Sequence, residues 1–398
     1  MSQQLISRSP DLKKLRDEGY TVEVRDAHLL IHNVPYVDCQ RQVRFGTLIS
    51  TLCLAGDVTH QPDTHVAYFA GEAPCTSAGI PILQIKHSDG PVQLTPTIHA
   101  SRSFSNKPRE GYRDYHHKMS TYAAILAGPA EAIDPAVTAR AFIAIKSDTP
   151  DCVHNYIDTA SSRAGIHRLS AKLAREVVAI IGCGGTGAYV LDFVAKTPVA
   201  EIRLFDRDQF LQHNAFRAPG APTLDALREA PTKVAYLREI YSRMHGNITA
   251  HPCHITPATA HQLEGVTFAF VCIDGGEGKA AVIQALEERN IPFADVGIGV
   301  QLVDDRLIGV VRTTTSRPGM RGHLRTRVSF GDADVGNEYN SNIQIAELNA
   351  LNASFAVIKW KKLRGIYLDL EGEHHSTFTI DGNSMINDDQ EEEDRDAA

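Results

Sequence analysis

Three closely spaced glycines are the first feature of this 398-residue sequence that could do chemistry. Gly182, Gly184 and Gly187 are spaced G-x-G-x-x-G, directly after the apolar run 177–181 and at the start of a helical pattern. Glycines let a backbone approach phosphates closely, and the free N–H groups at the start of a helix attract negative charge. Asp206 ends the next apolar run, where a carboxylate can accept hydrogen bonds from ribose hydroxyls. These residues predict a nucleotide site and fit a nicotinamide dinucleotide and ATP equally well.

The stretches that follow the glycine loop separate these two ligands. LFDRDQFLQHNAFRAPGA, TKVAYL and VCIDGGEGK resemble, in this order, the signature of the ThiF and ubiquitin-activating-enzyme superfamily. Members of that family adenylate the C-terminal carboxylate of a ubiquitin-like protein or peptide. In the family the loop is G-x-G-G-x-G, which Gly185 completes here. The resemblance spans residues 161 to 363 and implies an ATP site.

The resemblance also implies a role for each charged residue. Arg217 and Lys233 would hold phosphate oxygens, and Asp274 would bind magnesium. Joining a carboxylate to ATP brings two anions together and expels pyrophosphate, so the site must spread negative charge over cations. A guanidinium group grips phosphate in a bidentate way, and carboxylate oxygen is a hard ligand suited to magnesium. The nucleotide-binding residues implied are Gly182, Gly184, Gly185, Gly187, Asp206, Asp208, Asn214, Arg217 and Lys233.

Arg163, in the stretch SSRAG ahead of the glycine loop, resembles the family's arginine that reaches into the partner subunit's site. Arg168 lies nearby and is an alternative for that role. Taken singly, each of the other charged residues is typical of a turn, a helix cap or an exposed helix position. Their order behind the glycine loop favours the functional interpretation.

One part of the family pattern is missing. Enzymes of this family that pass a ubiquitin-like protein onward usually carry a thioester-forming cysteine before the long helix, but no cysteine follows Cys272 here. A hydroxyl such as Ser316 or Ser329, with His323 as its base, could accept the acyl group as an oxyester. Alternatively, the adenylate is handed straight to another protein's nucleophile. The cysteines include no C-x-x-C pair, so no zinc is expected.

The patterning predicts two domains and a tail. Residues 1–150 alternate short apolar runs with turn residues and contain a helical stretch around residues 112–122, which predicts a smaller, β-rich α+β domain. Residues 151–385 alternate strands and helices, which predicts a Rossmann-like, doubly wound and mainly parallel sheet that forms the adenylation domain. A two-stranded unit with an Asp-Asp turn and a long helix follow. Residues 386–398 are acidic and predict a disordered tail.

Composition narrows the setting. A formal net charge of -8 gives no electrostatic reason to expect nucleic acid. No window is apolar enough to cross a bilayer, and the polar first residues do not resemble a secretory signal, so we expect a cytoplasmic protein that does not bind membranes. Because members of the resembled family pair two adenylation domains, a single one here implies a homodimer.

The order of an extra domain before the adenylation domain resembles bacterial proteins of ubiquitin-like conjugation operons associated with phage defence. The sequence therefore predicts an activating enzyme that adenylates a ubiquitin-like protein and passes it to a conjugating-enzyme partner. A small peptide or a sulfur-carrier protein is an alternative substrate. An NAD(P)-dependent oxidoreductase and a non-catalytic scaffold are alternatives of other classes.

Overall fold

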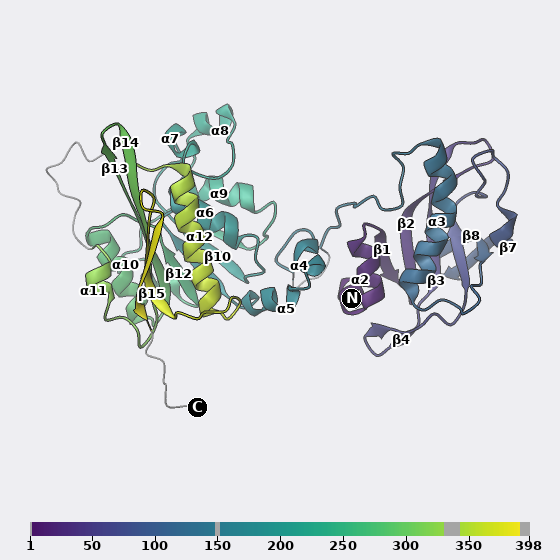
Figure 1. The fold of residues 1–398 in the computed structure, drawn as a ribbon, viewed down its shortest axis with the longest axis horizontal. Helices are drawn as coiled ribbons and strands as arrows, with labels where there is room; N and C mark the ends of the chain where they lie inside the picture. The colour runs from purple at the N-terminus through teal and green to yellow at the C-terminus, as the bar shows by residue number, and fades with distance from the viewer. Residues whose placement is uncertain (1, 148–151, 330–342, 391–398) are drawn as a thin grey trace. The chain divides into compact units, whose positions relative to one another are not determined.

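The computed structural model describes residues 2–147, 152–329 and 343–390. The chain divides into two compact units. Unit 1 comprises residues 1–151 and 156–165, and unit 2 comprises residues 152–155 and 166–398 (Figure 1). In the part of the chain that the structure describes, no helix combines the length and apolarity needed to cross a membrane.

Unit 1 is built on a six-stranded antiparallel sheet with helices on one face, so the expected α+β class is confirmed. The sheet order is β1-β2-β3-β6-β8-β7, and β4 and β5 form a separate small hairpin. The strands are β1 Thr21–Arg25, β2 His28–Val37, β3 Val43–Thr51, β4 Leu54–Ala55, β5 Val58–Thr59, β6 Val66–Ala70, β7 Lys86–Thr95 and β8 Ile98–Ser105. The helices are α1 Ser2–Arg8, α2 Pro10–Asp17, α3 Tyr115–Ile133 and α4 Thr159–Arg163, with a 3-10 turn at Leu83–Ile85.

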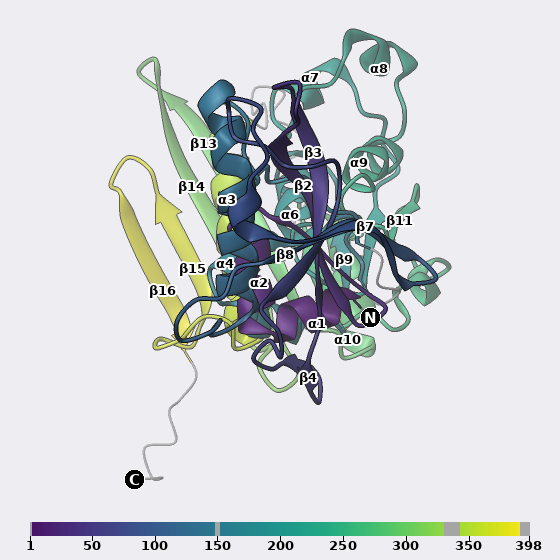
Figure 2. The same ribbon diagram turned by 90° about the vertical axis from the view of Figure 1, so that its right-hand side faces the viewer.

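Helix α3 covers the sheet of unit 1 (Figure 2). Asp114 caps it by accepting a hydrogen bond from the backbone N–H of His117. Tyr115, Met119 and Tyr122 recur at spacings of three and four, so they lie on one helical face, and all three are fully buried. Burial of this face against the strands positions the helix.

Unit 2 contains an eight-stranded sheet in the order β11-β10-β9-β12-β13-β14-β15-β16. The pairs from β11 to β13 are parallel and the pairs from β13 to β16 are antiparallel. The strands are β9 Val177–Ile181, β10 Glu201–Phe205, β11 Ile248–His251, β12 Phe268–Val271, β13 Phe293–Val303, β14 Arg306–Ser316, β15 Glu373–Thr379 and β16 Ser384–Gln390. The helices are α5 His167–Ser170, α6 Gly185–Val194, α7 Gln212–Ala215, α8 Leu224–Glu229, α9 Lys233–Tyr241, α10 Glu277–Glu288, α11 Leu324–Arg327 and α12 Ala346–Leu363, with 3-10 turns at Ala171–Leu173 and Ala260–Leu263.

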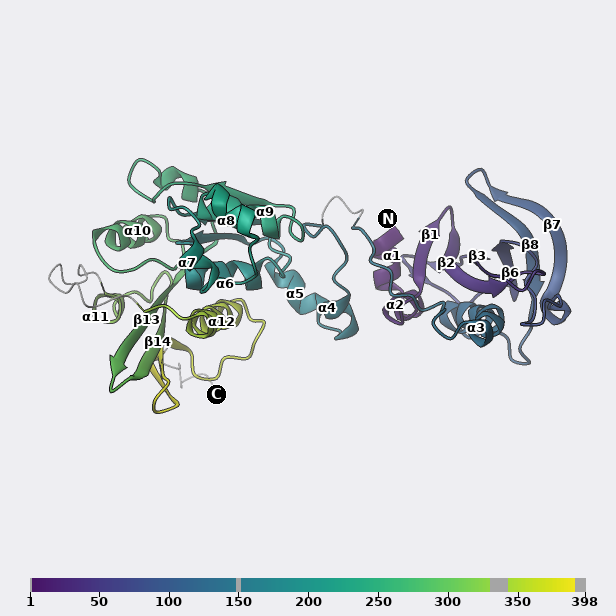
Figure 3. The ribbon, with the colours of Figure 1, turned by 90° about the horizontal axis from the view of Figure 1, so that it is seen from above.

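Helices cover both faces of this sheet, which confirms the expected Rossmann-like, doubly wound fold (Figure 3). Side chains alternate between the faces along a strand. Val178 and Ile180 of β9 join the core under α6, α9 and α12, whereas Ala179 and Ile181 join the core under α10 and α11. Loops at the carboxyl ends of the parallel strands therefore meet at one edge of the sheet, where ligands bind in open α/β folds.

The expected disordered tail is wrong for residues 386–390. These residues lie in β16, which pairs with β15 beside the β13–β14 hairpin (Figure 2). Two of the acidic side chains are held by Arg327 of α11, which contacts Asp388 at 3.3 Å and Asp389 at 2.9 Å. The sequence pattern predicted that these charges are solvated, because it does not show that Arg327 lies beside them. The rest of that predicted tail, residues 391–398, lies outside the described residues.

Candidate functional site

A cavity of about 280 Å³ lies at the carboxyl ends of the parallel strands in unit 2. Eight of the residues predicted from the sequence line it, and they come from the glycine loop, from the segments after β10, α7 and β12, and from the start of α9. These eight are Gly182, Gly184, Gly185, Asp206, Asp208, Arg217, Lys233 and Asp274. The fold thus brings together residues that are far apart in the sequence.

The glycine loop is as compact as its sequence predicts. Gly182 has a φ of +89°, which glycine adopts readily and other residues rarely do. A Cβ atom on Gly187 would lie 1.8 Å from the carbonyl oxygen of Gly182, so only glycine fits there, although Gly187 does not line the cavity. Helix α6 begins at Gly185 without a side-chain cap, which leaves backbone N–H groups directed at the cavity edge.

Two carboxylates and one ammonium group form the polar wall after β10. Asp206 accepts a hydrogen bond from the backbone N–H of Cys183 at 2.8 Å, which fixes this carboxylate against the glycine loop. Lys233 Nζ lies 2.7 Å from Asp208 Oδ2 and 3.6 Å from Asp206 Oδ2. The hydrogen bond from Lys233 lowers the pKa of Asp208 below its ordinary value. The ammonium group therefore stabilises the ionised form of the Asp208 carboxylate.

Asn214 and Arg217 carry polar atoms that lack a partner. Asn214 is buried, and its Oδ1 accepts a hydrogen bond from the backbone N–H of Leu211 at 2.8 Å. The Nδ2 of Asn214 and the Nε of Arg217 are buried without a hydrogen-bond partner among the described residues. Buried donors are normally satisfied, so these two fit a site that a ligand completes. Asn214 itself is not among the residues that line the cavity.

Asp274 is exposed and lines the cavity just after β12. Magnesium is commonly held by one or two carboxylates together with substrate phosphates, so one carboxylate at this place fits the ion. Among the described residues there is no group of three or more His, Cys, Asp or Glu side chains that could hold a metal by themselves.

A second, more apolar cavity of about 470 Å³ adjoins the first. The two cavities share Gly182, Asp206, Asp208 and Ile273. Its remaining walls include Phe205, Ile255, Pro257, Ala281 and Val282. A polar cavity beside an apolar one, with acidic groups between them, suits a ligand that has phosphates, a ribose and a flat base.

Sequence reasoning missed the contribution of α12 to the site. Asn349 of α12 is buried, accepts a hydrogen bond from Thr186 Oγ1 at 2.8 Å and donates to the carbonyl oxygen of Arg217 at 3.4 Å. A Cβ atom on Gly185 would lie 2.3 Å from Asn349 Nδ2, so the glycine is required for this contact. Asn352 lies one turn further and donates to the carbonyl oxygen of Gly297 at 3.0 Å. Two asparagines spaced i, i+3 on a buried helix face were the available signal.

Two protein-family models match parts of the chain. Residues 151–334 match the model of the ThiF family. The match to the ThiF family covers these residues, which are slightly less than half of the chain. Residues 10–159 match a domain of unknown function (DUF6791).

Solved structures of two proteins are similar to part of the chain. A crystal structure of E. coli MccB with ATP has 18% sequence identity, covers 57% of this chain and 70% of its own, and superposes with a TM-score of 0.46. A crystal structure of PaaA has 16% identity, covers 56% of this chain and 75% of its own, and has a TM-score of 0.44. A comparison with curated proteins finds no match.

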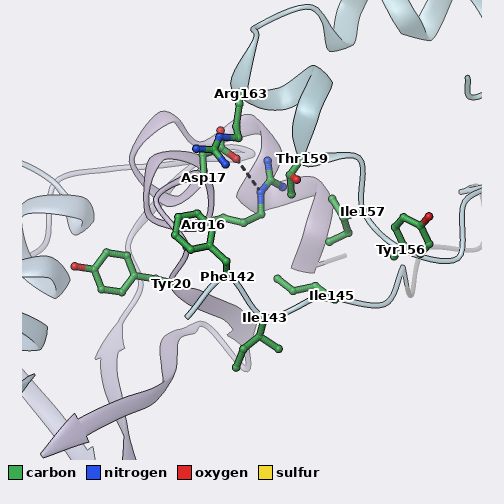
Figure 4. A pocket seen from close by; sticks show the side chains of 12 residues that line it. Arg16, Asp17, Tyr20, Phe142, Ile143, Ile145, Tyr156, Ile157, Thr159 and Arg163 are labelled. Atoms are coloured by element: carbon green, nitrogen blue, oxygen red, sulfur yellow. Dashed lines mark hydrogen bonds and ion pairs between the residues drawn. The ribbon is translucent and has the colours of Figure 1, made fainter. Parts of the chain in front are cut away.

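Arg163 does not line the cavity of unit 2 and lies instead in unit 1. It lines a separate cavity of about 300 Å³ with Arg16, Tyr20, Phe142 and Tyr156 (Figure 4). Its guanidinium carbon lies 5.6 Å from the centre of the Phe142 ring, which is a cation–π contact. That Arg163 reaches into a partner subunit's site stays a prediction.

The proposed pairing of Ser316 with His323 is wrong. Ser316 is fully buried at the end of β14, and its Oγ has no hydrogen-bond partner among the described residues. His323 Nε2 instead lies 2.8 Å from the carbonyl oxygen of Thr315, so that nitrogen carries a proton and is no base. Ser329 is exposed, directly before residues 330–342, and does not line the cavity. A role for Ser329 as acyl acceptor stays a prediction.

Proposed function

We propose that the chain is an ATP-dependent activating enzyme that adenylates the C-terminal carboxylate of a ubiquitin-like protein. The observation that carries this proposal is the single cavity that unites the glycine loop with Arg217, Lys233 and Asp274. A nicotinamide site needs the loop and the acidic residue but has no use for two cations and a further carboxylate at the phosphates. Acyl adenylation needs all of them.

In this proposal each charged group of the cavity has its own role. The N–H groups at the start of α6 and the Arg217 guanidinium hold phosphate oxygens, and the Lys233 ammonium moves from Asp208 towards the phosphate that is attacked. Asp206, fixed by the glycine loop, orients the ribose. Magnesium held at Asp274 would offset the charge of the phosphates when bound.

The balance of charge supports a divalent ion. The charged residues that line the cavity are three carboxylates, Asp206, Asp208 and Asp274, against two cations, Arg217 and Lys233. A lining with more acids than bases repels a free triphosphate. Bound together with magnesium, the same triphosphate carries less negative charge and fits this lining better.

We further propose a homodimer and direct transfer to a conjugating-enzyme partner. The β13–β14 and β15–β16 hairpins expose Leu302, Leu307, Met385 and Ile386, which is the kind of apolar surface that a second copy covers. The burial of Ser316 supports transfer of the adenylate to another protein's nucleophile rather than to that serine.

The test is ATP–pyrophosphate exchange, measured with a ubiquitin-like protein and with the same protein amidated at its C-terminus. The proposal predicts exchange with the free carboxylate only. Exchange with a short peptide but not with the protein would favour the peptide as substrate, and nicotinamide turnover would favour an oxidoreductase. ATP binding without exchange would point to a scaffold. Intact mass after hydroxylamine treatment then shows whether an ester forms on the chain.

A further inference from the structure

A buried charge cluster lies in unit 2 beside the cavity. Asp295 of β13 is fully buried and holds two cations, with Lys279 Nζ at 2.6 Å from Oδ1 and Arg312 Nη2 at 2.8 Å from Oδ2. Lys279 belongs to the first turn of α10, and Arg312 belongs to β14. We call Lys279, Asp295 and Arg312 the buried triad.

The buried triad lies directly behind the cavity wall. The two residues that follow Asp295 along β13, Val296 and Gly297, both line the cavity. A Cβ atom on Gly297 would lie 2.7 Å from Arg312 Nη2, so the guanidinium group rests against the backbone of that wall. Arg312 is fixed there by further hydrogen bonds to Thr314 Oγ1 at 3.0 Å and to the carbonyl oxygen of Arg327 at 2.8 Å.

The charges of the buried triad do not cancel. Two cations share one carboxylate, and among the residues that the structure describes no second carboxylate pairs with either cation. An ion pair that only held β13 to α10 or to β14 would need a single cation for the Asp295 carboxylate. The Lys279 side chain is only 3% exposed and that of Arg312 18%, so water shields this charge only in part, and an anion in the neighbouring cavity would supply a counter-charge.

The charged residues on the cavity surface offer little net positive charge to a phosphate group. The cavity lining contains three carboxylates and two cations, and Lys233 is already paired with two of those carboxylates. A polyphosphate therefore meets little net positive charge on the cavity surface itself. The buried triad behind Val296 and Gly297 adds two further cations close to this surface.

We infer that the buried triad is a positioning element that supplies positive charge through the cavity wall and makes the site prefer nucleotides with more phosphates. The inference rests on the proposed function, because it takes a nucleotide as the ligand. The triad does not touch the reacting atoms. It acts through the field of one uncompensated charge on the phosphate groups.

The test compares the affinities of ATP and AMP for the full-length chain by calorimetric titration. Arg312→Gln removes the uncompensated charge, and Arg312→Lys is the matched control that keeps it. A unit charge about 10 Å from added phosphate charge, at an effective dielectric constant of about 20, changes a binding constant by about tenfold. We expect the ratio of ATP affinity to AMP affinity to fall by about tenfold in Arg312→Gln and to change little in Arg312→Lys.

A merely structural role predicts another pattern. Damage to the cavity wall would weaken ATP and AMP by the same factor, and the ratio would stay constant, which would overturn the inference. If Arg312→Gln does not fold, Lys279→Met removes the same unit of charge from the other side of Asp295, and the same ratio decides. If the wild type binds ATP and the variants keep its ratio of ATP affinity to AMP affinity, the inference is refuted and the proposed function is not. Wild-type chain that binds neither nucleotide refutes the proposed function as well.

Discussion

Replacement of Lys233 by methionine is the sharpest perturbation of the proposed site. The ammonium group of Lys233 contacts both carboxylates that follow β10. Its Nζ lies 2.7 Å from Asp208 Oδ2 and 3.6 Å from Asp206 Oδ2. Methionine keeps most of the length and the apolar stem of the side chain but removes the charge. The variant therefore leaves two carboxylates facing any phosphate group in the cavity.

The magnitude follows from exposure and charge. The side chain of Asp208 is 64% exposed, so its pair with Lys233 contributes no more than about 1 kcal/mol to folding stability. A hydrogen bond from an ammonium group to phosphate contributes about 1.5–3 kcal/mol, which corresponds to a factor of roughly 10 to 150 in affinity. We expect Lys233→Met to weaken ATP binding within that range or beyond it, while the chain stays folded.

The assay is calorimetric titration of the wild-type and variant chains with ATP and magnesium, with circular dichroism as the check on folding. Lys196→Met is the matched control, because Lys196 forms an ion pair with Asp192 at 2.6 Å on the exposed surface of the same unit. The control should bind ATP as the wild type does. Equal ATP affinity in Lys233→Met and wild type would refute the assignment of Lys233 to the phosphates.

Three further predictions concern folding. Gly187→Ala places a Cβ atom 1.8 Å from a carbonyl oxygen and should lower the free energy of unfolding by about 2–4 kcal/mol in urea titrations, whereas Gly184→Ala meets no atom within 4 Å and should change it little; equal effects would contradict the loop packing. Arg327→Gln should speed hydrogen exchange of β15 and β16 without affecting β9, because it removes two ion pairs to β16; unchanged exchange would show that these pairs contribute nothing. Burial lowers the pKa of Lys118 from 10.5 to about 8, so the folded chain binds fewer protons than the unfolded chain between these pH values. The free energy of unfolding of unit 1 should therefore rise as the pH increases from 8 to about 10.5. Lys118→Met should abolish this rise, and a rise that persists in the variant would contradict the assignment.

Local pattern was sufficient for the parts of the fold where one physical rule dominates. The apolar run 177–181, followed by glycines and a helical period, predicted β9, the loop and α6 because strand burial and phosphate approach need those residue types. The Asp-Asp pair predicted a hairpin, and Asp304 and Asp305 indeed adopt positive φ values of 46° and 57° between β13 and β14.

Other features depend on partners that are distant in the sequence. Strand β15 buries Glu373, His374 and His375, a polar run without the alternation that marks a half-buried strand. Lys359 pairs with Glu373 at 2.5 Å, and Thr315 Oγ1 lies 2.9 Å from His374 Nδ1, so tertiary contacts satisfy these groups. Sequence periodicity carries no record of such contacts.

The site divides in the same way. Arg217, Lys233 and Asp274 were predicted because their order along the chain resembles a family, and the fold brings them to one cavity. Asn349 and the buried triad were not predicted, because the partners of a buried polar residue cannot be read from its own position in the sequence, and the asparagine spacing in α12 alone does not name a partner. Residues proposed to touch a ligand were therefore easier to predict than residues that pack behind the cavity.

The most direct test of the central claim is titration of the full-length chain with ATP in the presence of magnesium and, separately, with NADH. The account predicts that ATP binds, that Lys233→Met and Asp274→Ala weaken this binding, and that NADH gives no heat of binding. Binding of NADH in preference to ATP, or ATP binding that neither substitution affects, would contradict it.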